Sequence, residues 1–277
     1  MNIAPEILNY VAKKEGFAEV ILAPKASPVE RRAGALMKIM DIILSPEDIR
    51  DTLVSLRSHT PVSLGPLGKE GFFSFGLPEV GRIRVSYITQ RDSYVVSVVR
   101  VPYTIPPLES ILSRREDVNK LLKFIKDANG VVLIVARAFV IHNLFAYSLL
   151  QEICSRQQGL IYALEKPITY LIKHDASIVI QREVGVDVDS FEDGLNDALF
   201  LQPDIVYISD ITVRDTLRLI RKLSDVPMLT IVGITVPGVS ALYRDDLKDT
   251  MRAVSGIIEL DMEKGGKIEL SLKEGGP

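Results

Sequence analysis

The strongest constraint on the fold comes from residues 130–147, which read GVVLIVARAFVIHNLFAY. A glycine precedes five apolar residues, four of them β-branched, and the segment ends in a helical pattern. A strand that is apolar throughout is typical of the centre of a parallel sheet with both faces covered. A strand, a connection and a helix in this order also surround a phosphate-binding loop, but the glycines, lysine and serine or threonine of that motif are missing.

The residues after this segment continue to alternate between strand and helix patterns. Ser190 is placed to cap a helix, with Asp193 at the third helical position. Repeated strand–helix units predict a mostly parallel sheet flanked by helices, and residues 255–272 read as a terminal hairpin that turns at Gly265 and Gly266. The predicted strands are 131–135, 159–165, 177–181, 204–209 and 228–235, and the predicted helices are 142–156, 190–202 and 212–224.

The first part of the chain has a different pattern. Helices are predicted over 5–15 and 46–58, the second with Ser45 as its cap, and an alternating antiparallel meander follows them. Three prolines between Arg100 and Ser110 indicate an extended, semi-rigid connection. The sequence therefore predicts an α/β protein with a mixed N-terminal domain at 1–101, a proline-rich linker at 102–110 and a parallel α/β domain at 111–277.

Composition excludes several classes of function. The 277 residues carry a formal net charge of −3, which argues against a general nucleic-acid surface. No apolar run reaches the roughly 18 residues of a membrane span, so membrane insertion is not expected. The single cysteine, Cys154, permits no internal disulfide and fits a reducing cytoplasm. With one cysteine and three histidines, no zinc or other metal site is expected.

Residues 181–210, QREVGVDVDSFEDGLNDALFLQPDIVYISD, resemble the secretion ATPase superfamily, and within it the type IV pilus retraction (twitching-motility, PilT-type) ATPases. The resemblance extends over about residues 65–260. It implies a PAS-like N-terminal domain, a RecA-like P-loop NTPase core and assembly into rings, and the further C-terminal helices of the family are expected to be missing. The family motif within this stretch is Gln181, Arg182, Glu183, Val184 and Gly185.

The resemblance places a degenerate phosphate loop after the strand at 131–135. Phe139 and Ile141 stand at glycine positions, where a left-handed backbone is unfavourable by about 1–2 kcal/mol each, and their side chains would fill the phosphate space. His142 stands at the lysine and is mostly neutral near pH 7. The candidate nucleotide-binding positions are Ala136, Arg137, Ala138, Phe139, Val140, Ile141, His142 and Asn143.

The other catalytic motifs of the family are altered as well. The acidic box reads EKPIT, so Glu165 is retained but Lys166 follows it and is expected to pair with it. Asp210 replaces the glutamate after the Walker B strand, and residues 228–235, where the histidine box is expected, contain no histidine. Arg82, Arg84 and Arg91 remain as arginines that, in the family, reach toward the nucleotide or a neighbouring subunit.

Each of these residues also has a structural interpretation. His142 fits a helix start or a partly buried polar position, and Asn143 fits a helix cap. Glu165 fits a vestige of the acidic box that pairs with Lys166. Asp210 fits the N-cap of the helix predicted at 212–224. Arg82 and Arg91 fit solvated strand positions, or interface positions if a ring forms, and the segment from Gln181 to Gly185 fits a turn held against the sheet or a subunit contact.

The function that agrees best with these residues is a non-hydrolysing homologue of the pilus retraction and secretion ATPases. It is expected to be a cytoplasmic scaffold or regulatory partner without cofactor, bound to copies of itself or to an active ATPase or other component of a pilus, twitching or secretion machine. The alternative is a sensor or weak ATPase that binds ATP or ADP with magnesium. An active motor with a divergent loop and an unrelated α/β binding module are two further hypotheses.

Overall fold

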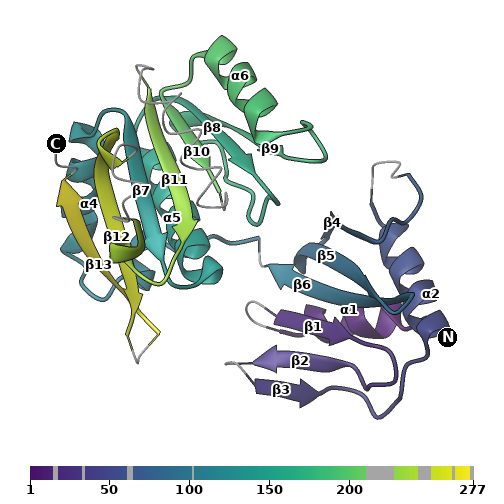
Figure 1. Cartoon of the computed structure of the whole chain (residues 1–277). Coiled ribbons are helices and arrows are strands. Elements are labelled where there is room, and N and C mark those ends of the chain that lie inside the picture. Colours follow the sequence, from purple (N-terminus) through teal and green to yellow (C-terminus); the bar gives the residue numbers. More distant parts are fainter. Residues whose placement is uncertain are drawn as a thin grey trace. The chain divides into compact units, whose positions relative to one another are not determined.

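The computed structural model describes residues 1–14, 18–32, 35–60, 65–101, 103–209, 228–242, 251–263 and 266–274, without the side chains of Arg32, Phe139 and Val140. The chain divides into two compact units, Met1–Thr104 and Ile105–Pro277 (Figure 1). Among the described residues, no helix has the length and apolar content that crossing a membrane requires.

The first unit is an antiparallel sheet of six strands in the order β3-β2-β1-β6-β5-β4. Helices α1 and α2 pack on one face of it, and their apolar side chains form a core with the inward residues of the strands. The predicted Ser45 cap is confirmed and is part of a capping box, because the Ser45 hydroxyl accepts from the Asp48 N–H and the Asp48 carboxylate accepts from the Ser45 N–H. The elements are α1 Ala4–Ala12, β1 Ala18–Leu22, β2 Val29–Arg32, β3 Ala35–Lys38, α2 Pro46–Arg57, β4 Glu70–Leu77, β5 Gly81–Gln90 and β6 Ser93–Val101.

The second unit is a seven-stranded sheet in the order β13-β12-β7-β11-β10-β8-β9, in which only the β12–β13 hairpin is antiparallel. The predicted mixed α/β class with one largely parallel sheet is thereby confirmed. The elements are α3 Leu108–Ile111, α4 Asp117–Asp127, β7 Val131–Ala136, α5 Phe139–Arg156, β8 Gly159–Glu165, β9 Ser177–Glu183, α6 Phe191–Leu201, β10 Ile205–Ile208, β11 Leu229–Thr235, the 3₁₀ turn Val239–Leu242, β12 Val254–Met262 and β13 Ile268–Glu274.

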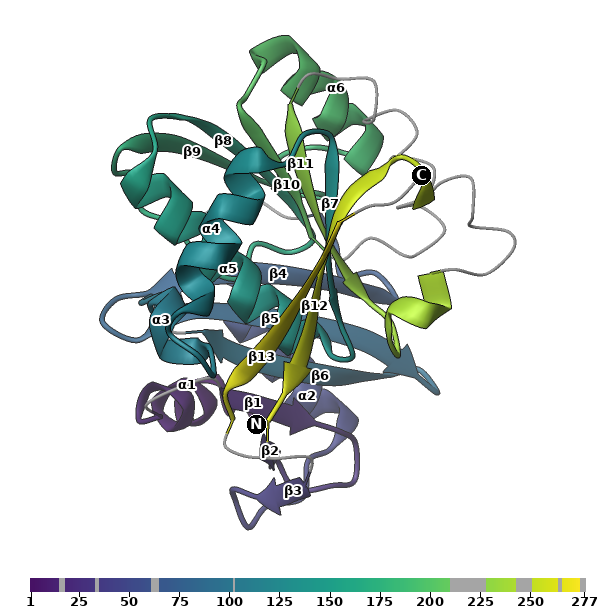
Figure 2. The same cartoon turned by 90° about the vertical axis from the view of Figure 1, so that its left-hand side faces the viewer.

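Helices cover both faces of this sheet (Figure 2). On one face, Leu133 and Val135 of β7 belong to the same apolar core as Leu195 and Ala198 of α6. On the other face, α5 crosses beneath β7, β11 and β9. Because side chains alternate along a strand, residues 163, 165, 207, 233 and 235 lie on the α5 side of the sheet.

Several local predictions need correction. Helix α5 begins at Phe139, three residues before the predicted start, and its N-cap is Ala138, so Asn143 lies in the second turn and does not cap the helix. The C-terminal end of the predicted linker forms the short helix α3. Residues 18–38 hold three strands that no sequence pattern predicted. The predicted helix at 212–224, Asp210 and Gly265 lie outside the described residues.

Candidate functional site

The connection between β7 and α5 is the segment where the sequence resemblance predicted a degenerate phosphate loop. Only Arg137 and Ala138 separate the last strand residue from the first helical residue. The N–H groups of Ile141 and His142 donate to the Ala138 carbonyl at 3.1 and 3.4 Å, so they close the first helical turn. A phosphate loop needs a longer glycine-rich segment whose N–H groups converge on one point. Here the connection has two residues, and the N–H groups of Ile141 and His142 are used within the first helical turn.

His142, which the sequence resemblance places at the family's lysine, is a core residue. Its side chain is fully buried, and its Nδ1 lies 3.2 Å from the Thr235 hydroxyl of β11. The ring packs against Gly233, where an added Cβ would lie 2.7 Å from the ring Cδ2. Burial lowers the pKa of His142 to about 4, so the ring is neutral at pH 7. A neutral, buried imidazole does not neutralise a phosphate. His142 lies in the first turn of α5, as the helix-start interpretation expects, but it is fully buried and not partly buried.

The side chains of Asn143 and Ile141, on either side of His142, are buried or half-buried. Asn143 is 3% exposed, and its side-chain nitrogen has no hydrogen-bond partner among the described residues. Ile141 is half-buried in the first turn of α5. The side chain of Phe139, which was expected to fill the phosphate space together with Ile141, lies outside the described part of the structure.

Glu165, the retained carboxylate of the acidic box, is buried at the end of β8. The Tyr147 hydroxyl of α5 donates to its Oε2, and the Gln181 side-chain amide of β9 donates to its Oε1 at 2.9 Å. The same tyrosine oxygen accepts from the Thr169 N–H at 2.7 Å. Burial, together with the Glu165 charge, raises the pKa of Tyr147 well above its usual value. Both carboxylate oxygens are thus engaged by neutral protein groups.

Lys166 does not act as expected. It is exposed, and in the described part of the chain no ion pair joins it to Glu165. Its backbone N–H donates to the buried Ser209 hydroxyl at 3.3 Å. The expected Lys166–Glu165 pair is therefore replaced by the hydrogen bonds from Tyr147 and Gln181.

The family motif at 181–185 holds the acidic-box segment to the sheet. Gln181 accepts from the Ile172 N–H at 2.8 Å and donates to the Tyr170 carbonyl at 2.9 Å. Glu183 accepts from the Ile168 N–H at 3.2 Å. Two side chains of one edge strand thereby fix three backbone positions in the segment that follows Glu165.

The remaining motif residues build the turn after β9. Arg182 donates to the Asp197 carboxylate of α6 and to the Asp187 carbonyl, the latter at 2.7 Å. Gly185 has φ +92°, a conformation that favours glycine, and its N–H donates to the Val188 carbonyl at 2.7 Å. The motif therefore links β9, its turn and α6.

The three candidate arginines lie in the first unit. Arg82 and Arg84 share one face of β5 and are half-buried, and Arg82 donates to the Ser74 hydroxyl at 2.6 Å. Arg91 is exposed in the β5–β6 turn with φ +49°. Asp210, the proposed Walker B residue, lies outside the described residues.

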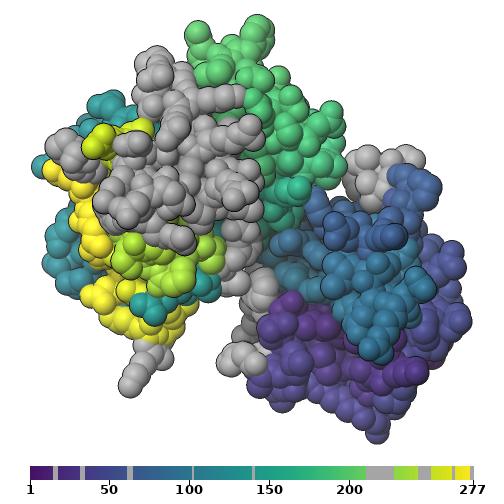
Figure 3. All heavy atoms as spheres, in the orientation of Figure 1, coloured from purple at the N-terminus to yellow at the C-terminus, as the bar shows by residue number. Residues whose placement is uncertain are grey.

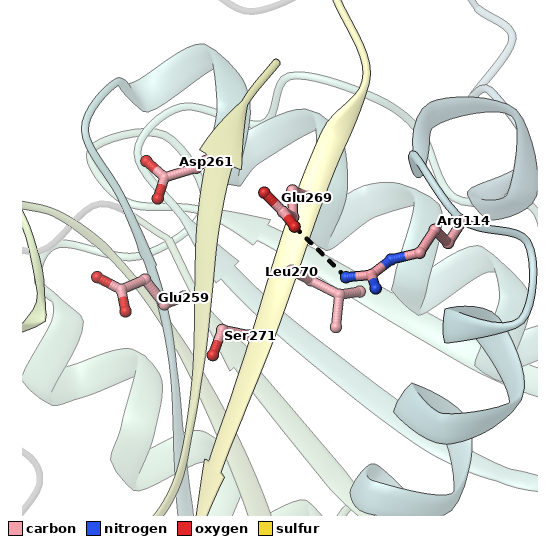
Figure 4. Close-up of a pocket in the computed structure, with 6 residues that line it drawn as sticks. All are labelled: Arg114, Glu259, Asp261, Glu269, Leu270 and Ser271. Atoms are coloured by element: carbon pink, nitrogen blue, oxygen red, sulfur yellow. Dashed lines mark hydrogen bonds and ion pairs between the residues drawn. The ribbon is translucent and has the colours of Figure 1, made fainter.

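A hollow of about 240 Å³ lies at the β12–β13 hairpin, away from Glu165 (Figure 4). In it, Arg114 approaches Glu269 at 3.4 Å, and the hydrogen bond from Lys273 lowers the pKa of Glu259. A lining with three carboxylates repels a phosphate, and no cluster with metal-ligand character occurs among the described residues. The lining residues are Arg114, Glu259, Asp261, Glu269, Leu270 and Ser271.

Sequence reasoning missed Tyr147 and Gly233, although each has a signal. Gly233 interrupts an apolar strand, which often marks the close approach of another group. Tyr147 lies on an apolar helix, where a buried hydroxyl needs a partner. Neither signal identifies the partner.

The chain has relatives among pilus ATPases. No family model matches it. It is 27% identical over 212 residues to the type IV pilus ATPase PilU of Pseudomonas aeruginosa, covering 76% of this chain and 54% of PilU. It is 23% identical over 215 residues to the type IV pilus retraction ATPase PilT of the same organism, covering 77% of this chain and 61% of PilT. The chain thus spans little more than half the length of these relatives.

Solved structures share its fold. The pilus retraction motor PilT with bound ADP superimposes with a TM-score of 0.76 at 23% identity, covering all of this chain and 84% of PilT. The ATPase DotB of Legionella pneumophila superimposes with a TM-score of 0.70 at 15% identity, covering 98% of this chain and 81% of DotB. The chain therefore has a PilT-like fold, and its sequence relates it to the type II and type IV secretion ATPase superfamily.

Proposed function

We propose that this protein is a non-hydrolysing homologue of the pilus retraction and secretion ATPases. Its role is that of a cytoplasmic scaffold or regulatory partner in a pilus, twitching or secretion machine. The observation that carries the proposal is the burial of His142 against Gly233, at the position where the family has its phosphate-binding lysine.

The chemistry of phosphoryl transfer supports this role. Catalysis of this reaction rests on positioning the phosphates and neutralising their charge. Here the side chain at the lysine position is neutral and the preceding connection has two residues. The carboxylate at the expected position of the catalytic base accepts hydrogen bonds from Tyr147 and Gln181, so both of its oxygens are engaged within the protein. The partner in this proposal is a second copy of the chain or an active ATPase of the same machine.

A phosphate-release assay on the full chain tests the proposal. We expect no release above that of the Glu165→Gln variant, in which the retained carboxylate is replaced by a neutral amide of the same shape. Activity that belongs to a contaminant is equal in both proteins, whereas activity of this chain falls in the variant. Magnesium-dependent release that the variant abolishes refutes the proposal.

Calorimetric titration with ATP or ADP and magnesium tests the alternative role of a nucleotide sensor. The related PilT structure holds ADP, which motivates the measurement. We expect no binding heat at millimolar nucleotide, because the loop backbone and the lysine charge are both missing. A saturable heat without phosphate release supports the sensor.

A further inference from the structure

The C-terminal end of α6 exposes a group of large apolar side chains. Phe200 is 87% exposed, and Leu199 and Leu201 on either side of it are 43% and 41% exposed. Helix α6 covers one face of the sheet in the second unit, and its green atoms are open to view in Figure 3. Single exposed apolar residues are common on proteins, but here the last turn of one helix exposes three large apolar side chains, and such an accumulation of exposed apolar area favours a partner.

The edge strand β9 adds Ile178 to this surface. Ile178 is 61% exposed and, by strand alternation, lies on the same face of β9 as Ile180 and Arg182. Ile180 packs against the core beneath α6, and Arg182 binds Asp197 of α6. Ile178 therefore lies on the α6 side of the sheet edge. We call Ile178, Leu199, Phe200 and Leu201 the α6 patch.

The segment of the chain that carries the α6 patch is strongly acidic. Residues 174–204, which contain it, hold eight acidic residues and one arginine, a net charge of −7, whereas the whole chain carries −3. The arginine is already paired with Asp197. Exposed carboxylates of this segment are those of Asp175, Asp187, Asp189, Glu192, Asp193 and Asp204.

We propose that the α6 patch binds a basic amphipathic segment of a partner protein. Apolar side chains of that segment would pack on Phe200 and its neighbours, and flanking lysines or arginines would meet the acidic rim. The inference deepens the proposed scaffold role. It rests on that role, because a scaffold requires a partner protein. A nucleic acid or an anionic membrane would be repelled by the rim. Two copies joined patch to patch would place the acidic rims against each other, because a two-fold contact uses the same surface twice.

The test uses a fluorescein-labelled helical peptide, LKKLLKLLKKLLKL, and its analogue with every lysine replaced by glutamate. Anisotropy is titrated with the full chain at low and high salt. We expect the basic peptide to bind, the acidic analogue not to bind, and added salt to weaken binding because the charges are exposed. Phe200→Ser should weaken binding about tenfold or more, since a large apolar side chain leaves the contact.

Matched variants locate the site. The double variant Asp189→Lys with Glu192→Lys should lower the affinity, whereas Glu6→Lys with Glu70→Lys, on exposed residues of the first unit, should not. Ile43→Ser, at a 66% exposed apolar residue elsewhere, is the control for Phe200→Ser. Circular dichroism melting checks that each variant is folded.

Three outcomes overturn the inference. They are failure of the basic peptide to bind, equal binding by the Phe200→Ser and Ile43→Ser variants, and a lower molecular mass of the Phe200→Ser variant in sedimentation. The last outcome assigns the α6 patch to self-association. Phosphate release decides the proposed function independently, because none of these variants changes His142 or Glu165.

Discussion

A double-mutant cycle between His142 and Gly233 tests the central observation of the site. The imidazole ring occupies the space where a Cβ at residue 233 would lie, at 2.7 Å from the ring Cδ2 and 3.0 Å from Nε2. Real Cβ atoms do not approach other heavy atoms this closely, so Gly233→Ala must displace the ring or the strand. Since both are buried, the displacement strains the contact between α5 and β11.

The expected magnitude follows from the cost of overpacking a core. Gly233→Ala alone should lower the free energy of unfolding by about 1–3 kcal/mol. In the His142→Ala background the added methyl group enters the space that the ring has left, so most of this loss should disappear. The two substitutions should therefore be coupled by about 1–3 kcal/mol, in the range of residues in direct contact.

Urea unfolding of the wild type, both single variants and the double variant, followed by circular dichroism, measures the coupling. Gly65→Ala is the control, because no atom lies within 4 Å of a Cβ built at that position. Additive losses, with Gly233→Ala equally costly in both backgrounds, would show that the ring does not sit on Gly233. The reasoning that removes His142 from phosphate binding would then be wrong.

Three further predictions use the same unfolding measurement. Buried His142 has a pKa of about 4, whereas a histidine in the unfolded chain has its ordinary pKa of about 6.5. As pH falls below about 6.5, the unfolded chain therefore binds a proton that the folded chain does not, and the free energy of unfolding should decline by up to about 3 kcal/mol. His142→Gln should remove that part of the decline, and an unchanged pH profile would contradict the burial. Tyr147→Phe should lower the free energy of unfolding by about 1–3 kcal/mol, because the buried Glu165 carboxylate and the Thr169 N–H both lose a hydrogen-bond partner. Hydrogen exchange at the Thr169 amide should become faster. An unchanged exchange rate would show that the tyrosine does not hold this segment. Gly194→Ala places a Cβ 2.5 Å from Leu164 Cδ1 and should destabilise the protein by about 1–3 kcal/mol, whereas no loss relative to Gly65→Ala would refute this packing.

Much of the fold was predictable because its signals are local. The apolar run at 131–135 and the Ser45 and Ser190 caps identify a central strand and two helix starts from neighbouring residues alone. The strands at 18–38 escaped prediction because two of them, Val29–Arg32 and Ala35–Lys38, have four residues each and no clear alternation. Their pairing with distant β6, through β1, is what makes them strands.

The sequence by itself determined that the chain contains no G-x-x-x-x-G-K-[ST] motif, because residue identity needs no coordinates. Only the tertiary structure decided which contacts His142 and Glu165 make. Thr235, which contacts His142, lies 93 positions away in the sequence. Tyr147 of α5 donates a hydrogen bond to Glu165 of β8, which lies 18 positions away. Such partners depend on how the sheet face and α5 pack, and no local pattern encodes a contact between distant segments of the chain.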